Sequence, residues 1–115
     1  MAEQLNGTTL ELEVALSRVG GDAELLKEIA SLFLEEYPKV LMDLRDALTR
    51  EDGRLLERTA HGLKGSVSNF GARAAVEAAF RLENMGRARQ FNEVDRALNT
   101  LEHALAALRP ELESL

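Results

Sequence analysis

The chain contains no cysteine, no tryptophan, a single tyrosine and only two prolines. Without cysteine, neither a disulfide nor a thiolate metal site can form. With so few aromatic residues, the core has to be built mainly from Leu, Ala, Val and Ile. The scarcity of proline, together with abundant Leu, Ala, Glu and Arg, favours helix throughout the chain.

The sequence also lacks the charge and hydropathy patterns of several protein classes. Its formal net charge is −6, which argues against nucleic acid as a partner because phosphate backbones bind basic surfaces. No apolar run reaches the length of a membrane span, and no basic segment followed by an apolar one opens the chain. These features predict a cytoplasmic protein without membrane insertion. At 115 residues, the chain is long enough for one packed domain.

The start of the sequence predicts a polar lead-in followed by a short helix. The lead-in comprises residues 1–7. Thr8 and Glu11 fit a capping box, which predicts a short helix over about residues 8–19. The glycine pair that begins at Gly20 ends this helix, because glycine adopts the left-handed cap conformation at little cost.

Four longer amphipathic segments follow between about residues 22 and 109. Asp22 caps the first of them. Its apolar stripe resumes beyond Pro38, which predicts a kink rather than a break. The remaining segments run from Arg54 to about Asn69, from about Ala72 to Arg87, and onward from a start at Asn92 and Asp95.

Segments of this kind joined by short turns imply an all-α fold, an antiparallel up-and-down four-helix bundle with a short additional N-terminal helix. The last segment has an uninterrupted stripe with alternating spacings of four and three, which is typical of a bundle seam. That stripe consists of Val94, Leu98, Leu101, Leu105, Leu108 and Leu112. We expect residues 1–115 to form a single domain, with the N-terminal helix covering one end of the bundle.

One histidine lies on the polar face of the segment over residues 54–69. The apolar stripe of that segment consists of Leu56, Ala60, Leu63, Val67 and Phe70. At about 100° per residue, His61 points roughly 140° away from the middle of the stripe. The residues that share its side are Arg54, Glu57, Arg58, Lys64, Gly65 and Ser68. The helical phase therefore predicts an exposed imidazole with cations beside it.

Two glycines, Gly62 and Gly65, stand next to this histidine inside a helix, where each costs about 1 kcal/mol relative to alanine. Gly65 lies about 40° from His61 and one turn along, so its missing side chain opens a notch for another molecule. Lys64 lies about 60° to the other side, within reach of negative charge carried by the ring. Neutral imidazole is nucleophilic near neutral pH, and an ammonium offsets developing phosphoryl charge. The cluster predicts a histidine that takes and gives a phosphoryl group.

Other kinds of chemistry have less support in the residues. His61 has no His, Asp or Glu three or four positions on, and His103 lies far along the chain among alanines, so we expect no metal site. Ser66 lacks the strand-turn-helix elbow of serine hydrolases. The plain alternatives are a solvated surface histidine and a Lys64 that only pairs with an acidic neighbour, Glu57 or Glu83.

The segment Ala60-His61-Gly62-Leu63-Lys64-Gly65-Ser66, followed by Asn69-Phe70-Gly71-Ala72, resembles the signature of histidine-containing phosphotransfer (HPt) domains. Residues 15–22, 33–38 and 82–87 are similar to further parts of that family, so the resemblance extends over nearly the whole chain. It implies a phosphorelay intermediate, whose histidine receives a phosphoryl group from the aspartyl phosphate of one response-regulator receiver domain and passes it to another. The implied partners are receiver domains and a hybrid sensor histidine kinase.

The resemblance also implies a role for individual residues. His61 is the phosphoryl carrier, Lys64 the neighbouring cation, and Gly65 the small residue that lets the receiver close in. Glu83 occupies the place where the family often has a glutamine or glutamate contacting the imidazole, and Arg87 matches a basic position near the site in some members. The receiver brings its own aspartate and Mg²⁺, so no cofactor is expected here. We expect a monomeric carrier, not an enzyme with independent turnover.

Two other functions stay open at this point. The phosphoacceptor domain of a chemotaxis-type histidine kinase is similar in pattern and would be phosphorylated by an ATP-binding domain. A helical interaction module whose histidine is never phosphorylated would leave the positions of Lys64 and Gly65 unexplained. Dimerising histidine kinase domains differ more, because an acidic residue usually follows their histidine where Gly62 stands in this chain.

Overall fold

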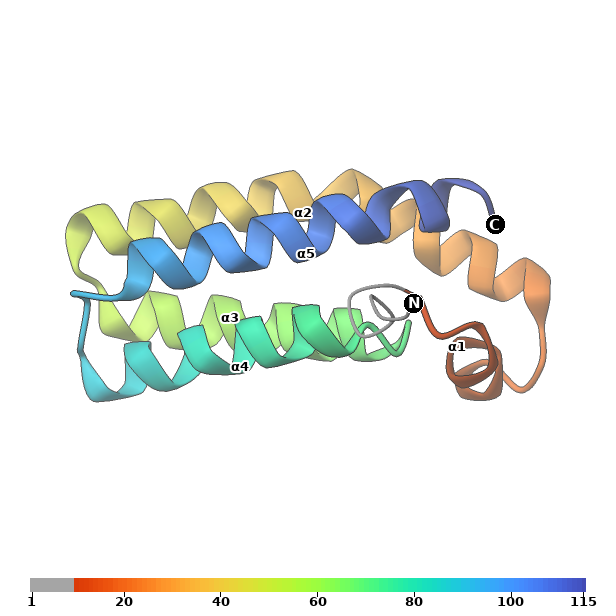
Figure 1. Ribbon diagram of the computed structural model, residues 1–115, viewed down its shortest axis with the longest axis horizontal. Helices are drawn as coiled ribbons and strands as arrows, with labels where there is room; N and C mark the ends of the chain where they lie inside the picture. Colours follow the sequence, from red (N-terminus) through yellow and green to blue (C-terminus); the bar gives the residue numbers. More distant parts are fainter. Residues whose placement is uncertain (1–9) are drawn as a thin grey trace, which may run out of the picture.

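The computed structural model describes residues 10–115, which form five helices (Figure 1). The helices are α1 (Leu12–Arg18), α2 (Ala23–Arg50), α3 (Gly53–Ser68), α4 (Arg73–Ala88) and α5 (Val94–Glu113). Helices α2 to α5 run up and down as an antiparallel bundle, and α1 lies beside one of its ends (Figure 1). The described residues contain no strand, so the predicted all-α bundle with an additional N-terminal helix is confirmed.

Short polar side chains begin two of the bundle helices. Asp22 caps α2 by accepting the N–H of Leu25 at 3.1 Å, and Asp52 caps α3 by accepting the N–H of Leu55 at 3.0 Å. Both contacts satisfy an amide that has no partner inside its helix. Helix α2 runs through Pro38 without interruption, so the proline does not break it.

Helix α1 is shorter than its sequence predicts. It begins at Leu12, because Glu11 occupies the extended N-cap position and its N–H donates to the carbonyl of Phe70 at 2.9 Å. This bond ties the start of α1 to the turn between α3 and α4. Thr8, the other half of the predicted capping box, lies outside the described residues.

Helix α5 also begins differently from its prediction. Glu93, not Asn92, holds the N-cap position, and no side chain caps the helix. Asp95 lies in the first turn, where the positive end of the helix dipole stabilises a carboxylate. Pro110 does not end the helix, which continues to Glu113.

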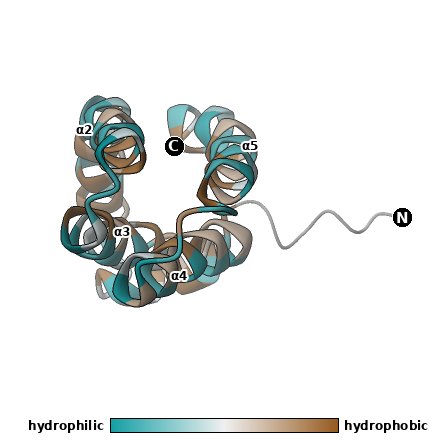
Figure 2. Cartoon of the chain, turned by 90° about the vertical axis from the view of Figure 1, so that its left-hand side faces the viewer, coloured by the Kyte–Doolittle hydropathy of each residue, from teal (hydrophilic) through white to brown (hydrophobic). Residues whose placement is uncertain are grey.

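The apolar stripes of the four long helices meet inside the bundle (Figure 2). The predicted stripe of α3 and the following turn is buried throughout: Leu56, Ala60, Leu63, Val67 and Phe70. Phe70 meets the ring of Phe33 edge-on at 5.5 Å between centroids, which fixes α2 against the end of α3. Each large apolar side chain buried in this way contributes about 1.5–3 kcal/mol to folding.

Helices α3 and α4 approach each other closely at two glycines. A Cβ on Gly86 would lie 2.6 Å from the backbone nitrogen of Glu57 and 2.7 Å from the carbonyl oxygen of Gly53. A Cβ on Gly53 would lie 2.6 Å from the carbonyl oxygen of Gly86. Only residues without a side chain permit this contact between backbones. It brings side chains one turn away on α4 within reach of α3.

We expect Gly86→Ala to destabilise the protein by about 1–3 kcal/mol, because the new methyl group forces the two helix backbones apart. Gly62→Ala is the matched control, since a Cβ there meets nothing within 4 Å. It should stabilise the helix by about 0.5–1 kcal/mol. Urea unfolding followed by circular dichroism measures both changes. Wild-type stability in Gly86→Ala would contradict the close approach.

Candidate phosphoryl-transfer site

His61 lies near the middle of α3, on the face turned away from the core. Its side chain is 68% exposed. A Cβ on Gly62 or on Gly65 would meet no other atom within 4 Å. The structure therefore presents the imidazole with open space beside it, as the helical phase predicts.

Glu83 of α4 fixes one nitrogen of this imidazole. Its side chain is only 5% exposed, and its Oε2 lies 3.0 Å from Nδ1 of His61. Because an ionised carboxylate only accepts hydrogen bonds, Nδ1 has to carry the hydrogen. The lone pair of the ring is then on Nε2, on the side of the ring away from Glu83.

Lys64 is held beside the histidine by two groups of α4. Its Nζ lies 2.8 Å from Oε1 of Glu83 and 4.7 Å from the centre of the Phe80 ring. The Lys64 side chain is 26% exposed. The ammonium is therefore positioned one turn from His61, and Glu83 is its acidic partner.

Arg87 joins the same carboxylate from the next turn of α4. Its Nη2 lies 3.1 Å from Oε2 of Glu83, and its Nε donates to Oε2 of Glu57 at 3.0 Å. Its Nη1 donates to the side-chain oxygen of Asn84 at 3.3 Å. Arg87 thus touches the site through Glu83, and it bridges α3 and α4 through Glu57.

The charge of Glu83 depends on these neighbours. The Lys64 ammonium lowers the pKa of Glu83 most strongly, the hydrogen bond from His61 lowers it further, and burial opposes both. The net direction is downward, so the carboxyl group stays ionised at neutral pH. Removing the charged partners of a buried carboxylate typically costs several kcal/mol.

Four of the five predicted site residues meet in this cluster: His61, Lys64, Glu83 and Arg87. Gly65 takes no part in it and lies beside it as open space. Sequence reasoning did not single out Phe80 as part of the site. The only signal for Phe80 is its position three residues before Glu83, on the same face of a helix.

A basic rim continues from the site towards the start of α3. Arg54 and Arg58 line the same surface hollow as His61 and Gly62. All four residues are exposed. The lining also includes Arg87 and two acids, Glu57 and Glu83. Three arginines and two carboxylates therefore surround the histidine of a chain whose net charge is −6.

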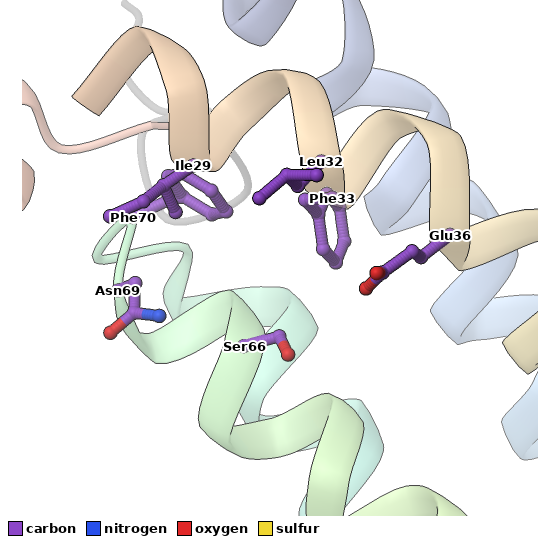
Figure 3. Close-up of a pocket in the computed structure, with 7 residues that line it drawn as sticks. All are labelled: Ile29, Leu32, Phe33, Glu36, Ser66, Asn69 and Phe70. Atoms are coloured by element: carbon purple, nitrogen blue, oxygen red, sulfur yellow. The ribbon is translucent and has the colours of Figure 1, made fainter. Parts of the chain in front are cut away.

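A second hollow lies between α2 and the end of α3 (Figure 3). Its lining consists of Ile29, Leu32, Phe33, Glu36, Ser66, Asn69 and Phe70. Leu32 is 55% exposed at its edge. No sequence signal identifies this hollow, because its two sides come from segments that are far apart in the sequence, Ile29–Glu36 and Ser66–Phe70.

Two other kinds of feature are absent from residues 10–115. No three His, Asp or Glu side chains among them cluster as a metal site would require. None of the helices in this range combines the length and the hydropathy needed to cross a membrane.

We expect Glu83→Gln to reduce the free energy of unfolding at pH 7 by about 1–3 kcal/mol, because Lys64 and Arg87 lose their shared carboxylate. The pKa of Glu83 is lower in the folded chain than in the unfolded chain. Its contribution is therefore complete above the unfolded pKa of about 4.3 and is lost as the pH falls through the folded pKa.

Unfolding by urea between pH 7 and pH 2.5 measures this difference. The difference in the free energy of unfolding between wild type and Glu83→Gln should decrease towards zero as the pH falls. Glu113→Gln, which removes an exposed pair with Arg109, serves as the control and should change stability by about 0–1 kcal/mol. A difference that stays constant over the whole pH range would contradict the ionised state of Glu83.

Comparisons with known proteins identify a family and a similar fold. The family model of the Hpt domain matches residues 28–111. The fold is similar to the crystal structure of histidine-containing phosphotransfer protein B from Pseudomonas aeruginosa PAO1, with a TM-score of 0.84, 24% sequence identity and 91% of each chain covered. A search of curated protein sequences found no match.

Proposed function

Because the chain belongs to the Hpt domain family, we propose that it carries a phosphoryl group on His61 between receiver domains of a two-component phosphorelay. The contact of 3.0 Å between Nδ1 of His61 and Glu83 supports this most directly. It leaves Nε2 as the nucleophilic nitrogen of an exposed ring. The two residues belong to different helices, so the fold itself selects the reactive nitrogen.

The transfer step follows from the state of the ring. Nε2 attacks the phosphorus of the receiver's aspartyl phosphate, an N–P bond forms, and the P–O bond to the aspartate breaks with its electrons left on that carboxylate. Because Nδ1 keeps its hydrogen, the phosphorylated ring is a cation, and the carboxylate of Glu83 stabilises it. Lys64 offsets the charge of the phosphoryl group. Transfer to a second receiver is the reverse reaction.

The receiver supplies the rest of the chemistry in this proposal. It brings the aspartate and Mg²⁺, so this chain needs no cofactor or ATP-binding site and has no turnover of its own. Phosphoryl transfer then depends mainly on positioning and on charge stabilisation. A rigid bundle that displays one histidine meets this requirement.

The surface around His61 has features that suit a docked receiver. Gly62 and Gly65 leave open space next to the ring. Leu32 offers an exposed apolar side chain across the hollow from Ser66 (Figure 3). We further propose that the protein works as a cytoplasmic monomer of one domain, served by a hybrid sensor histidine kinase.

Two alternatives make different demands on the same site. A phosphoacceptor domain of a chemotaxis-type kinase would accept a phosphoryl group from an ATP-binding domain and not from a receiver. A helical module that is never phosphorylated has no use for a buried carboxylate with three polar partners. The network around Glu83 favours the phosphorylated forms.

We expect a phosphorylated receiver domain to label the wild-type protein and to leave His61→Gln unlabelled, because only Nε2 of His61 is a suitable acceptor. The label should be stable in alkali and labile in acid, as a phosphoramidate is. Lys64→Ala should keep its fold and accept the label about 10–100-fold more slowly, since one charge-stabilising group is lost. Rapid-quench assays with radiolabelled phosphate measure both rates.

Equal labelling of wild type and His61→Gln would disprove the proposed site. His103→Gln is the matched control and should be labelled like wild type, because His103 is exposed on α5 and its Nδ1 bonds to the carbonyl of Asn99. Labelling by an ATP-binding kinase domain, with none from any receiver, would favour the chemotaxis-type alternative.

We expect Gly65→Gln to weaken receiver docking, because its side chain fills the open space one turn from His61. The expected result is a rise of about tenfold or more in the receiver concentration at half-maximal transfer, which corresponds to about 1.4 kcal/mol. Ala107→Gln places the same side chain at an exposed position of α5 and should have no effect. Unchanged transfer by Gly65→Gln would show that the receiver does not use this space.

A further inference from the structure

Two negatively charged groups can attract the ammonium of Lys64: the carboxylate of Glu83 and a phosphoryl group on His61. In the structure this ammonium lies 2.8 Å from Oε1 of Glu83. Within residues 10–115, Oε1 has no polar partner besides Lys64. A phosphoryl group on His61 would attract the same ammonium, and its departure would leave Oε1 buried and bare. The charge of Glu83 is then balanced by the ring cation of phosphorylated His61 and by any further cation that contacts the carboxylate.

We propose that Arg87 stays paired with Glu83 as its counter-ion before and after transfer. Lys64 can then leave Glu83 for the phosphoryl group on His61. Arg87 is then a positioning residue, because it acts through Glu83 and does not contact the imidazole. This inference rests on the proposed function of His61.

The contacts of Arg87 suit this role. Its Nη2 already lies 3.1 Å from Oε2 of Glu83, so no long movement is needed to hold the carboxylate. Its Nε is anchored by Glu57, whose carboxylate forms an ion pair with neither His61 nor Lys64 within residues 10–115 and is therefore free to hold Arg87 when they react. The bond from Nη2 to Glu83 is charge-assisted, which makes it stronger than a hydrogen bond between neutral groups.

The charges balance before and after transfer. Before transfer, Glu83 is paired with the cations of Lys64 and Arg87. After transfer, the ring of His61 is a cation that donates from Nδ1 to Glu83, Arg87 stays, and Lys64 pairs with the phosphoryl oxygens. Without Arg87, the release of Lys64 leaves the ring of His61 as the only cation on a buried carboxylate, so the release costs more. The phosphorylated state then becomes less favourable.

The test is the equilibrium distribution of label between a phosphorylated receiver and this protein. Arg87→Gln should shift that equilibrium away from phosphorylated His61 by about three- to tenfold, the effect expected for a partly exposed charged hydrogen bond. Arg87→Lys keeps the positive charge and should recover part of the loss. Arg96→Gln, which alters an exposed arginine of α5, should match wild type.

A double variant separates this role from a structural one. When Lys64 is already replaced by glutamine, no ammonium has to be released, so Arg87→Gln should no longer lower the equilibrium constant. An equal loss in both backgrounds would overturn the counter-ion role, and so would an Arg87→Gln variant that partitions like wild type. Circular dichroism of each variant verifies that it is folded.

These outcomes differ from a failure of the proposed function. If wild type and His61→Gln take up label equally, the carrier role of His61 itself fails. If only His61 is labelled and Arg87→Gln partitions normally, the carrier role stands and the inference about Arg87 is wrong.

Discussion

The contact between Gly53 and Gly86 is the constraint on which the site depends. It lets the backbones of α3 and α4 touch, with a Cβ on either residue falling within 2.6–2.7 Å of backbone atoms. Glu83 stands just under one turn before Gly86 on α4, and at this helix separation its carboxylate reaches the imidazole of His61. A wider separation would leave the histidine without a partner for Nδ1. The geometry of the reactive ring is thus set by two residues that have no side chains.

A single buried carboxylate then organises the charged groups around it. Glu83 receives an imidazole N–H, an ammonium and a guanidinium on two oxygen atoms. Burial makes each of these contacts stronger than it would be in water, and it also makes an unpaired carboxylate expensive. The same burial that orients His61 therefore requires cations nearby. In the proposed reaction, the cationic ring of phosphorylated His61 replaces Lys64 as one of the cations that Glu83 requires.

Helical periodicity was sufficient to predict the bundle and the exposure of His61, because both depend on the phase of residues within one helix. Periodicity within one helix does not predict which side chains of two helices meet. The residues alone left Glu57 and Glu83 open as partners of Lys64, and only the family resemblance placed Glu83 against the imidazole. The contact of Phe80 with Lys64 was missed, because it depends on how closely α3 and α4 pack. The start of α2 was predicted correctly because the side chain of Asp22 caps it. The start of α5 was misplaced, because Asn92 does not cap that helix.

The exposed imidazole offers one reactive nitrogen, since the other is bound to Glu83. In the proposed relay, a donor and an acceptor must therefore bind the same surface one after the other, and they cannot bind it at the same time. The carrier must let go of the first partner before it meets the second. Tight binding of either one would slow the whole pathway, so selection in such a relay favours brief encounters over lasting complexes.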